Sequence, residues 1–281
     1  HTHKYFIYIF QKIHILHIMI KHLSEKLQLS ERSIQNTIEL LDEGCTIPFI
    51  ARYRKERTGS LDEVQIASIS DLATKWREME KRKDTIRKTI TEQGKMTPEL
   101  EKRIAECDNA ETLEDIYLPF KPKRRTKAQV AREQGLEPLA TLIMLGREQR
   151  PEEAAKRFVK GEVKSAADAI QGAQYIIAET VSEDERSRHT VRRQFERDAI
   201  ITSKVVKAKA DTEEAAKYKD YFDWQEPLRR CPSHRMLAMR RGEAEGILRV
   251  SISTDDDECI ERLKRNNVRC QGRCATLYRE A

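Results

Sequence analysis

Apolar residues recur at intervals of three and four positions along most of the chain up to Arg197, the spacing of one face of an α-helix. The longest regular run lies between Asp62 and Gly94, and Lys83 is its only interruption. Its apolar positions are Ile69, Leu72, Trp76, Met79, Ile86 and Ile90. This alternation predicts one long helix with a heptad seam along one side.

A second, shorter helix is expected to return along that seam. Thr97 followed by Pro98 is a helix start, because threonine caps the first turn and proline fits its first position. Leu100, Ile104 and Cys107 then supply an apolar face. We predict an intramolecular antiparallel hairpin, and dimerisation through the same seam is the alternative.

The residues before the long helix resemble a helix-turn-helix. Leu23 and Leu27 lie on one face of a first short helix, and Ser30 begins a second that Gly44 ends. Such a pair can read a DNA groove, or it can simply be two packed helices. Further helix starts are predicted at Thr112, Thr126, Pro151, Ser165 and Ser182.

The pattern changes after Arg197. β-Branched residues follow at 200–206, and apolar and polar residues alternate over 247–253, which predicts two short strands around a helix that Ser233 caps. The predicted fold class is therefore mainly α. A helical domain with the long hairpin covers 19–197, and a small mixed α/β region covers 198–281.

Composition agrees with a helical protein that has solvated, charged faces. Charged residues make up 36% of the chain and aromatic residues only 6%, which disfavours both a β-sandwich and a disordered tail. The formal net charge of +6 is the small difference between 53 basic and 47 acidic residues. Binding to nucleic acid must therefore come from local clusters of cations.

The first such cluster lies in the segment 46–65. It combines Tyr53 with four basic residues and ends at a turn glycine; the basic residues are Arg52, Arg54, Lys55 and Arg57. These cations can contact phosphates while Tyr53 stacks on a base. The alternative is structural: residues 47–50 are buried, and the arginines pair with Glu56, Asp62 and Glu63.

The second cluster lies in the segment 115–135. Pro119 and Pro122 stop the preceding helix, so the cations after them lie on extended backbone up to Thr126, which with Gln129 forms a capping box. The basic residues are Lys121, Lys123, Arg124, Arg125 and Lys127. No acidic residue separates them, and a helix N-terminus follows, so this cluster is the first candidate for phosphate binding.

These two segments, together with 232–246 (PSHRMLAMRRGEAEG), resemble in wording, order and spacing the Tex family of bacterial transcription accessory proteins. The resemblance runs from about Leu23 to Gly272. It implies the amino-terminal half of a non-enzymatic protein that acts on transcription with RNA or DNA as partner. It further implies an RNase H-like domain, helix-hairpin-helix motifs and an RNA-binding OB-fold beyond this chain, and the expectation is a chain truncated before the RNase H-like domain.

Other groupings favour ordinary structural roles. Ser233 and His234 are adjacent on a helix start and do not face each other as a nucleophile and a base must. The acidic run 255–258 suits the N-terminus of the helix after it better than a metal site. A zinc site would need Cys231, His234, Cys270 and Cys274, whose spacing is unusual. No catalysis, cofactor or metal is predicted.

The ends of the chain and its location complete the predictions. Residues 1–18 are rich in Ile, His, Tyr and Phe and precede the first methionine, Met19, so they are interpreted as a non-native upstream extension. The apolar stretch 5–10 is too short for a membrane span, and the cytoplasm is the expected location. The competing function is a scaffold that positions downstream RNA-binding domains and contacts RNA polymerase or other proteins.

Overall fold

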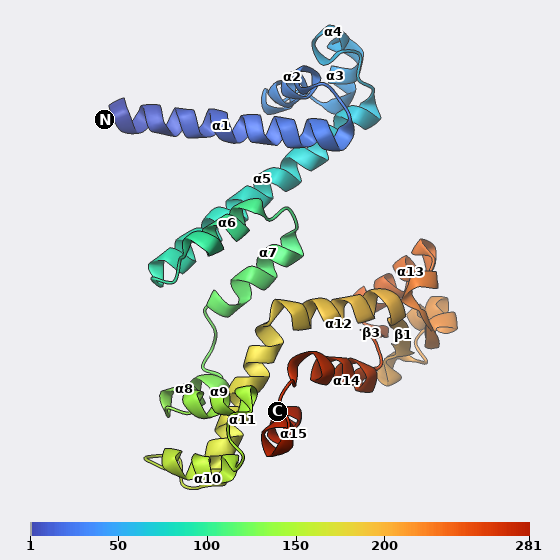
Figure 1. Ribbon diagram of the computed structural model, residues 1–281. Coiled ribbons are helices and arrows are strands. Elements are labelled where there is room, and N and C mark those ends of the chain that lie inside the picture. The colour runs from blue at the N-terminus through green and yellow to red at the C-terminus, as the bar shows by residue number, and fades with distance from the viewer. Residues whose placement is uncertain (1) are drawn as a thin grey trace. The chain divides into compact units, whose positions relative to one another are not determined.

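The computed structural model describes the backbone from Thr2 to Ala281 and the side chains from Ile15 onward. The chain forms two compact units, His1–Leu113 and Glu114–Ala281. The change of pattern near Arg197 lies inside the second unit, where a helix gives way to a strand. The fold class is as predicted, with many helices and one small sheet (Figure 1).

The first unit is entirely helical over the residues that the structure describes. Its helices are α1 Thr2–Leu27, α2 Glu31–Asp42, α3 Ile47–Tyr53, α4 Lys55–Thr58, α5 Glu63–Glu92 and α6 Pro98–Glu106. α1 is much longer than the short helix expected before Ser30, and it passes through Met19 without a break. The predicted extension over 1–18 lies mostly among residues whose side chains are outside the described part.

The predicted hairpin is present as α5 and α6. Asp62 caps α5 in a capping box with Gln65, and Thr97 caps α6. Ile69, Ile86 and Ile90 in the seam are fully buried, so the heptad pattern marks the packed face.

Lys83 does not interrupt that seam, although the sequence suggested that it does. It is only 5% exposed, and its ammonium donates to Glu80 Oε1 at 2.9 Å and to the carbonyl of Ala105 at 3.0 Å. The aliphatic stem therefore packs as an apolar side chain would, while the charged end is satisfied at the edge.

The core of the first unit joins α1, α2, α3 and α5. Its fully buried members include Met19, Leu23, Ile34, Ile50 and Ile66. Because all four helices contribute, the pair formed by α1 and α2 is part of this core.

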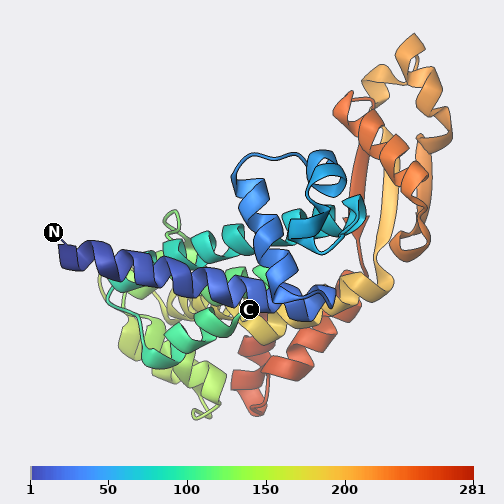
Figure 2. The same ribbon diagram turned by 90° about the horizontal axis from the view of Figure 1, so that it is seen from above.

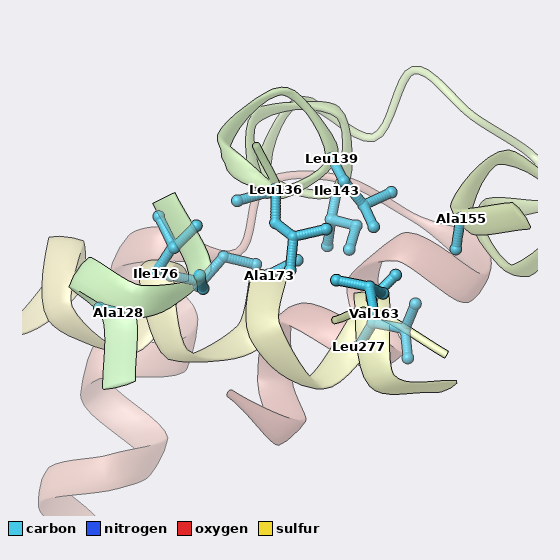
Figure 3. Packing of buried hydrophobic residues seen from close by; sticks show 13 residues of the cluster. Ala128, Leu136, Leu139, Ile143, Ala155, Val163, Ala173, Ile176 and Leu277 are labelled. Atoms are coloured by element: carbon cyan, nitrogen blue, oxygen red, sulfur yellow. The ribbon is translucent and has the colours of Figure 1, made fainter. Parts of the chain in front are cut away.

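The second unit begins in α7 Ala110–Tyr117 and the 3₁₀ turn Leu118–Phe120, and continues through five α-helices and a further 3₁₀ turn. These are α8 Lys127–Glu133, α9 Glu137–Leu145, α10 Pro151–Ala155 with the 3₁₀ turn Lys156–Phe158, α11 Ala166–Glu183 and α12 Glu185–Asp198. Figure 3 shows Leu136, Leu139 and Ile143 packed against Ala173 and Ile176 of α11, with Leu277 below them. Small residues on α11 allow this close approach, and Gly172 leaves no space for a side chain beside Leu136.

An antiparallel sheet follows α12, with strand order β2-β1-β3 (Figure 2). β1 Ile200–Val205 pairs with β3 Leu248–Ser253, in agreement with the two predicted strands. β2 Asp223–Pro227 was not predicted, because its five residues are mostly polar. The remaining elements are the 3₁₀ turns Lys207–Lys209, Glu213–Tyr221 and Leu228–Arg230 and the helices α13 Ser233–Ala244, α14 Asp256–Asn267 and α15 Gly272–Glu280.

Several predicted helix starts are displaced by a few residues. The side chain of Asn109, and not that of Thr112, accepts the N–H at the start of α7. Asp184 caps α12, while Ser182 lies inside α11. Pro232 stands at the cap of α13, where Ser233 was expected. In the first two cases a competing polar residue lay nearby, and either was chemically able to cap.

Candidate nucleic-acid interface

The segment Lys121–Thr126, here called the basic loop, is non-helical, as its prolines predicted. It leaves the 3₁₀ turn Leu118–Phe120 in extended backbone and ends at Thr126, whose hydroxyl accepts the N–H of Gln129 at 3.0 Å. The cap is therefore present. Gln129, however, turns its amide to Glu133 at 3.4 Å and not back to the cap, so only half of the predicted capping box is formed.

Two glutamates of α11 anchor the basic loop. Lys123 pairs with Glu183, and its ammonium lies 3.8 Å from Glu179. Burial alone raises the pKa of Glu179, but hydrogen bonds from Arg132 and Thr126 and the charge of Lys123 outweigh burial and lower it. Lys123 is neutralised although the loop itself contains no acidic residue, because the carboxylates come from a helix more than fifty positions away in the sequence.

The other cations of the second cluster fall into two groups. Arg125 pairs with Glu133 at 2.9 Å, and the Lys127 ammonium lies 4.9 Å from the ring centre of Tyr175. Lys121 and Arg124 are exposed and form no ion pair with any residue that the structure describes. These two side chains are therefore the cations of the loop that are available to an external anion.

A buried carboxylate fixes the helix that leads into the loop. Asp115 is only 4% exposed. It accepts hydrogen bonds from Arg188 at 2.5 Å and Arg192 at 2.9 Å, one turn apart on α12. Burial raises the pKa of Asp115, but the two guanidinium groups outweigh that effect, so the pKa lies below its ordinary value. Sequence spacing gave no sign of this contact.

The first cluster lies on α3 and α4, which meet at Arg54. Arg57 pairs with Glu39 at 3.4 Å and approaches Glu43 at 3.9 Å. The predicted partners Glu56, Asp62 and Glu63 were thus the wrong carboxylates. The expected burial of 47–50 holds fully only for Ile50, since Pro48 and Phe49 are exposed.

The remaining members of the first cluster face solvent. Arg52 and Lys55 are exposed and unpaired within the described residues. Arg54 lies 5.0 Å from the centre of the Phe49 ring, and the rings of Phe49 and Tyr53 are 5.4 Å apart.

The segment 232–246, the third of those that resemble the Tex family, is held by an ion pair to β2. Arg235 on α13 donates to Glu226 of β2 at 2.6 Å and lies over the ring of Trp224. Glu226 also accepts from the Trp224 indole at 3.0 Å. This contact accounts structurally for one arginine of the segment.

The groupings weighed for metal or catalysis are spread apart or already engaged. Among the described residues, no group of three His, Cys, Asp or Glu side chains lies close enough to hold a metal ion. Cys274 donates to the Glu148 carbonyl at 3.1 Å, whereas Cys231 follows the 3₁₀ turn Leu228–Arg230. Asp255 caps α14 at 3.0 Å, in agreement with the predicted helix-terminal role.

A groove of about 720 Å³ lies in the second unit between α11, α12, α14 and α15. Its walls are mostly apolar and include Ile177, Val191, Leu263 and Tyr278. Arg188 and Arg192 at its side already bind Asp115.

Over the described residues, no helix is both long enough and apolar enough to cross a bilayer.

Comparison with known proteins gives consistent matches over both units. Residues 17–91 match the family model described as Tex-like protein N-terminal domain, and residues 146–279 match the Tex central region-like model. The chain is 43% identical over 236 residues to the transcriptional accessory protein Tex of Neisseria gonorrhoeae, covering 84% of this chain and 31% of that protein. It is 46% identical over 233 residues to protein YhgF of Escherichia coli, covering 82% and 30%.

A more distant match extends to animals. The chain is 28% identical over 246 residues to the human S1 RNA-binding domain-containing protein 1, covering 85% of this chain and 24% of that protein. The chain thus spans about a third or less of the length of these curated relatives.

Proposed function

The chain belongs to the Tex-like family, and on this premise we propose that it is a non-catalytic, nucleic-acid-associated part of a transcription accessory protein that acts in the cytoplasm. Relatives support the proposal by name: one is a transcriptional accessory protein, and another carries an S1 RNA-binding domain. The ligand class that we propose is RNA or DNA, bound chiefly through its phosphates.

The observation that carries the proposal is the pair of free cations on the basic loop. Lys121 and Arg124 are exposed and unpaired in the described structure, on a backbone that the anchored residues beside them hold in place. A preorganised cation loses less conformational freedom on binding than one on a mobile tail. Replacing counterions on a phosphate chain is favourable and independent of sequence.

A second function rests on a different observation. Lys123, Arg125 and Arg57 are already neutralised by carboxylates of the protein. Together with the greater length of the relatives, this favours a helical scaffold that positions other RNA-binding domains or contacts transcription proteins. In that case the basic clusters hold the fold together and do not touch nucleic acid.

A salt titration of RNA and duplex DNA binding by the whole chain distinguishes the two functions. Each phosphate contact lowers the logarithm of the affinity by about 0.9 per tenfold rise in salt on duplex DNA, and by about 0.7 on a single strand. The Lys121→Gln/Arg124→Gln variant should bind more weakly to every sequence and show a slope shallower by about two units on duplex DNA.

The matched control removes a lysine and an arginine from the strand region, where Lys207 and Arg230 are also exposed and form no ion pair with another described residue. The Lys207→Gln/Arg230→Gln variant has the same net charge as the loop variant and should keep the wild-type slope. If both variants bind alike, the loop is not the contact site. If the wild-type chain shows no binding at low salt, the scaffold is the better account.

A further inference from the structure

The first unit presents a compact aromatic and cationic surface on α3 and the start of α4, whose cations Arg52, Arg54 and Lys55 form no ion pair with another described residue. Tyr53 is 62% exposed and Phe49 is 37% exposed, on the same side of α3 and four positions apart. Their rings lie 5.4 Å apart at an angle of 45°. The Arg54 guanidinium lies 5.0 Å from the Phe49 ring centre, so ring and cation form one continuous surface. We call this the Phe49–Arg54 surface.

The backbone beneath this surface is firmly held. Ile50, the residue after Phe49 on α3, is completely buried in the core of the first unit, and the next residue, Ala51, is buried there too. The Asn36 side chain donates to the Arg57 carbonyl at 2.6 Å, and Arg57 pairs with Glu39, which ties α4 to α2. Gly59 closes the turn with a φ of 73°, a conformation that other residues adopt at a cost. The exposed rings are therefore set in position before any ligand arrives.

The charges around the rings favour one class of ligand. Arg52 directly precedes Tyr53 and Lys55 directly follows Arg54 in the chain, and both are exposed without an ion-pair partner in the described structure. Glu56 is the one acidic side chain within α3 and α4. Exposed aromatic faces between free cations are what a flexible polyanion with planar bases requires: the bases stack and the phosphates meet the cations. A duplex hides its base faces and cannot use the rings.

We propose that the Phe49–Arg54 surface is a stacking site for unpaired bases of single-stranded RNA or DNA. The proposal rests on the proposed function for the class of ligand and adds where and how unpaired bases are held. Tyr53 stacks on a base, Phe49 and Arg54 extend the stack, and Arg52 and Lys55 contact the adjoining phosphates. The basic loop of the second unit supplies phosphate contacts only.

The test compares two single-stranded oligonucleotides of equal length and charge, one with bases and one abasic, binding to the full chain. Stacking is worth roughly 1–3 kcal/mol per base, so Tyr53→Ala should weaken binding of the base-bearing strand by about 5- to 150-fold. Binding of the abasic strand should be unchanged. The salt slope should also be unchanged, because a tyrosine ring releases no counterion. Tyr53→Trp should keep the affinity, and the new tryptophan should lose fluorescence when a base stacks on it.

Three results would overturn the stacking site. One is wild-type binding of both strands by Tyr53→Ala with an unchanged circular dichroism spectrum. Another is an equal loss of affinity for the two strands. The third is a Tyr53→Trp signal that responds to an acidic peptide but not to the base-bearing strand, which would assign the surface to a protein partner.

Variants of the loop keep this inference separate from the proposed function. If Lys121→Gln/Arg124→Gln binds normally while Tyr53→Ala does not, the loop assignment fails and the stacking site stands. The reverse pattern removes the stacking site and leaves the loop in place.

Discussion

Replacing Asp115 with asparagine should destabilise the second unit and loosen the helix that leads to the basic loop. The substitution keeps the size of the side chain and removes its charge from between Arg188 and Arg192. Breaking a fully buried ion pair costs about 3–5 kcal/mol, and an exposed pair is worth about 0–1 kcal/mol. Asp115 is buried, but the arginine side chains are 40% and 30% exposed. We therefore expect a loss between these limits, about 2 kcal/mol.

The pH dependence gives this prediction its sign. The folded-state pKa of Asp115 lies below the unfolded value, which is about 3.9. Its contribution is therefore fully present above the unfolded pKa and is lost as the pH falls through the folded pKa. The wild type and Asp115→Asn should differ at neutral pH and converge in strong acid.

Urea denaturation measures the effect. The chain has two tryptophans, and Trp224 lies in the second unit, so a Trp76→Phe background lets fluorescence report that unit alone. With a typical urea slope of about 1–3 kcal/mol per molar, the midpoint should fall by about 1 M. The matched control Asp211→Asn changes an exposed aspartate that has no ion-pair partner among the described residues, and it should have almost no effect.

A double-mutant cycle with Arg192→Gln identifies the partner. The coupling between the two substitutions should exceed about 0.5 kcal/mol at neutral pH, because the residues are in direct contact. A cost that is the same at neutral and acidic pH, or a coupling indistinguishable from zero, would refute the electrostatic account. The side chain would then act through packing alone.

Three further predictions concern stability and are checked by urea denaturation, with fluorescence of Trp76 in a Trp224→Phe background for the first unit. The free energy of unfolding of Lys83→Met should lie within about 1 kcal/mol of the wild-type value, because the stem of Lys83 already packs in the seam. Lys83→Glu should lower it by about 2 kcal/mol or more, because it places a carboxylate beside Glu80 and the Ala105 carbonyl. Equal losses for the two variants would contradict this. Asp62→Ala should cost about 0.5–2 kcal/mol by removing the capping box of α5, and an unchanged midpoint would mean that the cap is dispensable. Gly172→Ala, measured by Trp224, should cost about 1–3 kcal/mol because its methyl group would overlap the Leu136 side chain, while the exposed Ala167→Ser on the same helix serves as control.

The parts of the fold that the sequence predicted are those set by neighbours in the chain. Ser30, Thr97 and Ser165 cap helices as predicted, because each accepts an N–H only a few positions away. The hairpin could be predicted for a similar reason, because the apolar residues of its seam repeat every seven positions along the chain. Where two capping residues stood close together, as with Ser182 and Asp184, local chemistry could not choose between them.

Contacts between distant positions were not predictable. Asp115 meets Arg188 and Arg192 across more than seventy positions, and nothing in the spacing of either segment marks them as partners. Glu179 and Glu183 likewise reach Lys123 only because α11 packs beside the start of α8. β2 was not predicted because the side-chain pattern of Asp223–Pro227 is not that of a strand. These residues form a strand because they pair with β1.

For the basic loop, the sequence predicted the course of the backbone but not the ion pairs of its side chains. The sequence placed Lys121, Lys123, Arg124 and Arg125 on an extended segment before Thr126, which was correct for the backbone. It could not separate Lys121 and Arg124, which remain free in the described structure, from Lys123 and Arg125, which have carboxylate partners. Telling the free cations from the paired ones requires the three-dimensional structure, because each carboxylate partner lies on another element.

The pairing of Lys123 with Glu183 has a consequence for counting contacts by ion release. A phosphate that takes Lys123 displaces Glu183, and the freed carboxylate then attracts a cation from solution. The nucleic acid gives up about one condensed cation at the same moment. The two exchanges nearly cancel, so such a contact tightens or weakens binding while leaving the salt slope almost unchanged. A salt slope measured on this protein therefore numbers the lysines and arginines that were free before binding, and not all of those that touch phosphate.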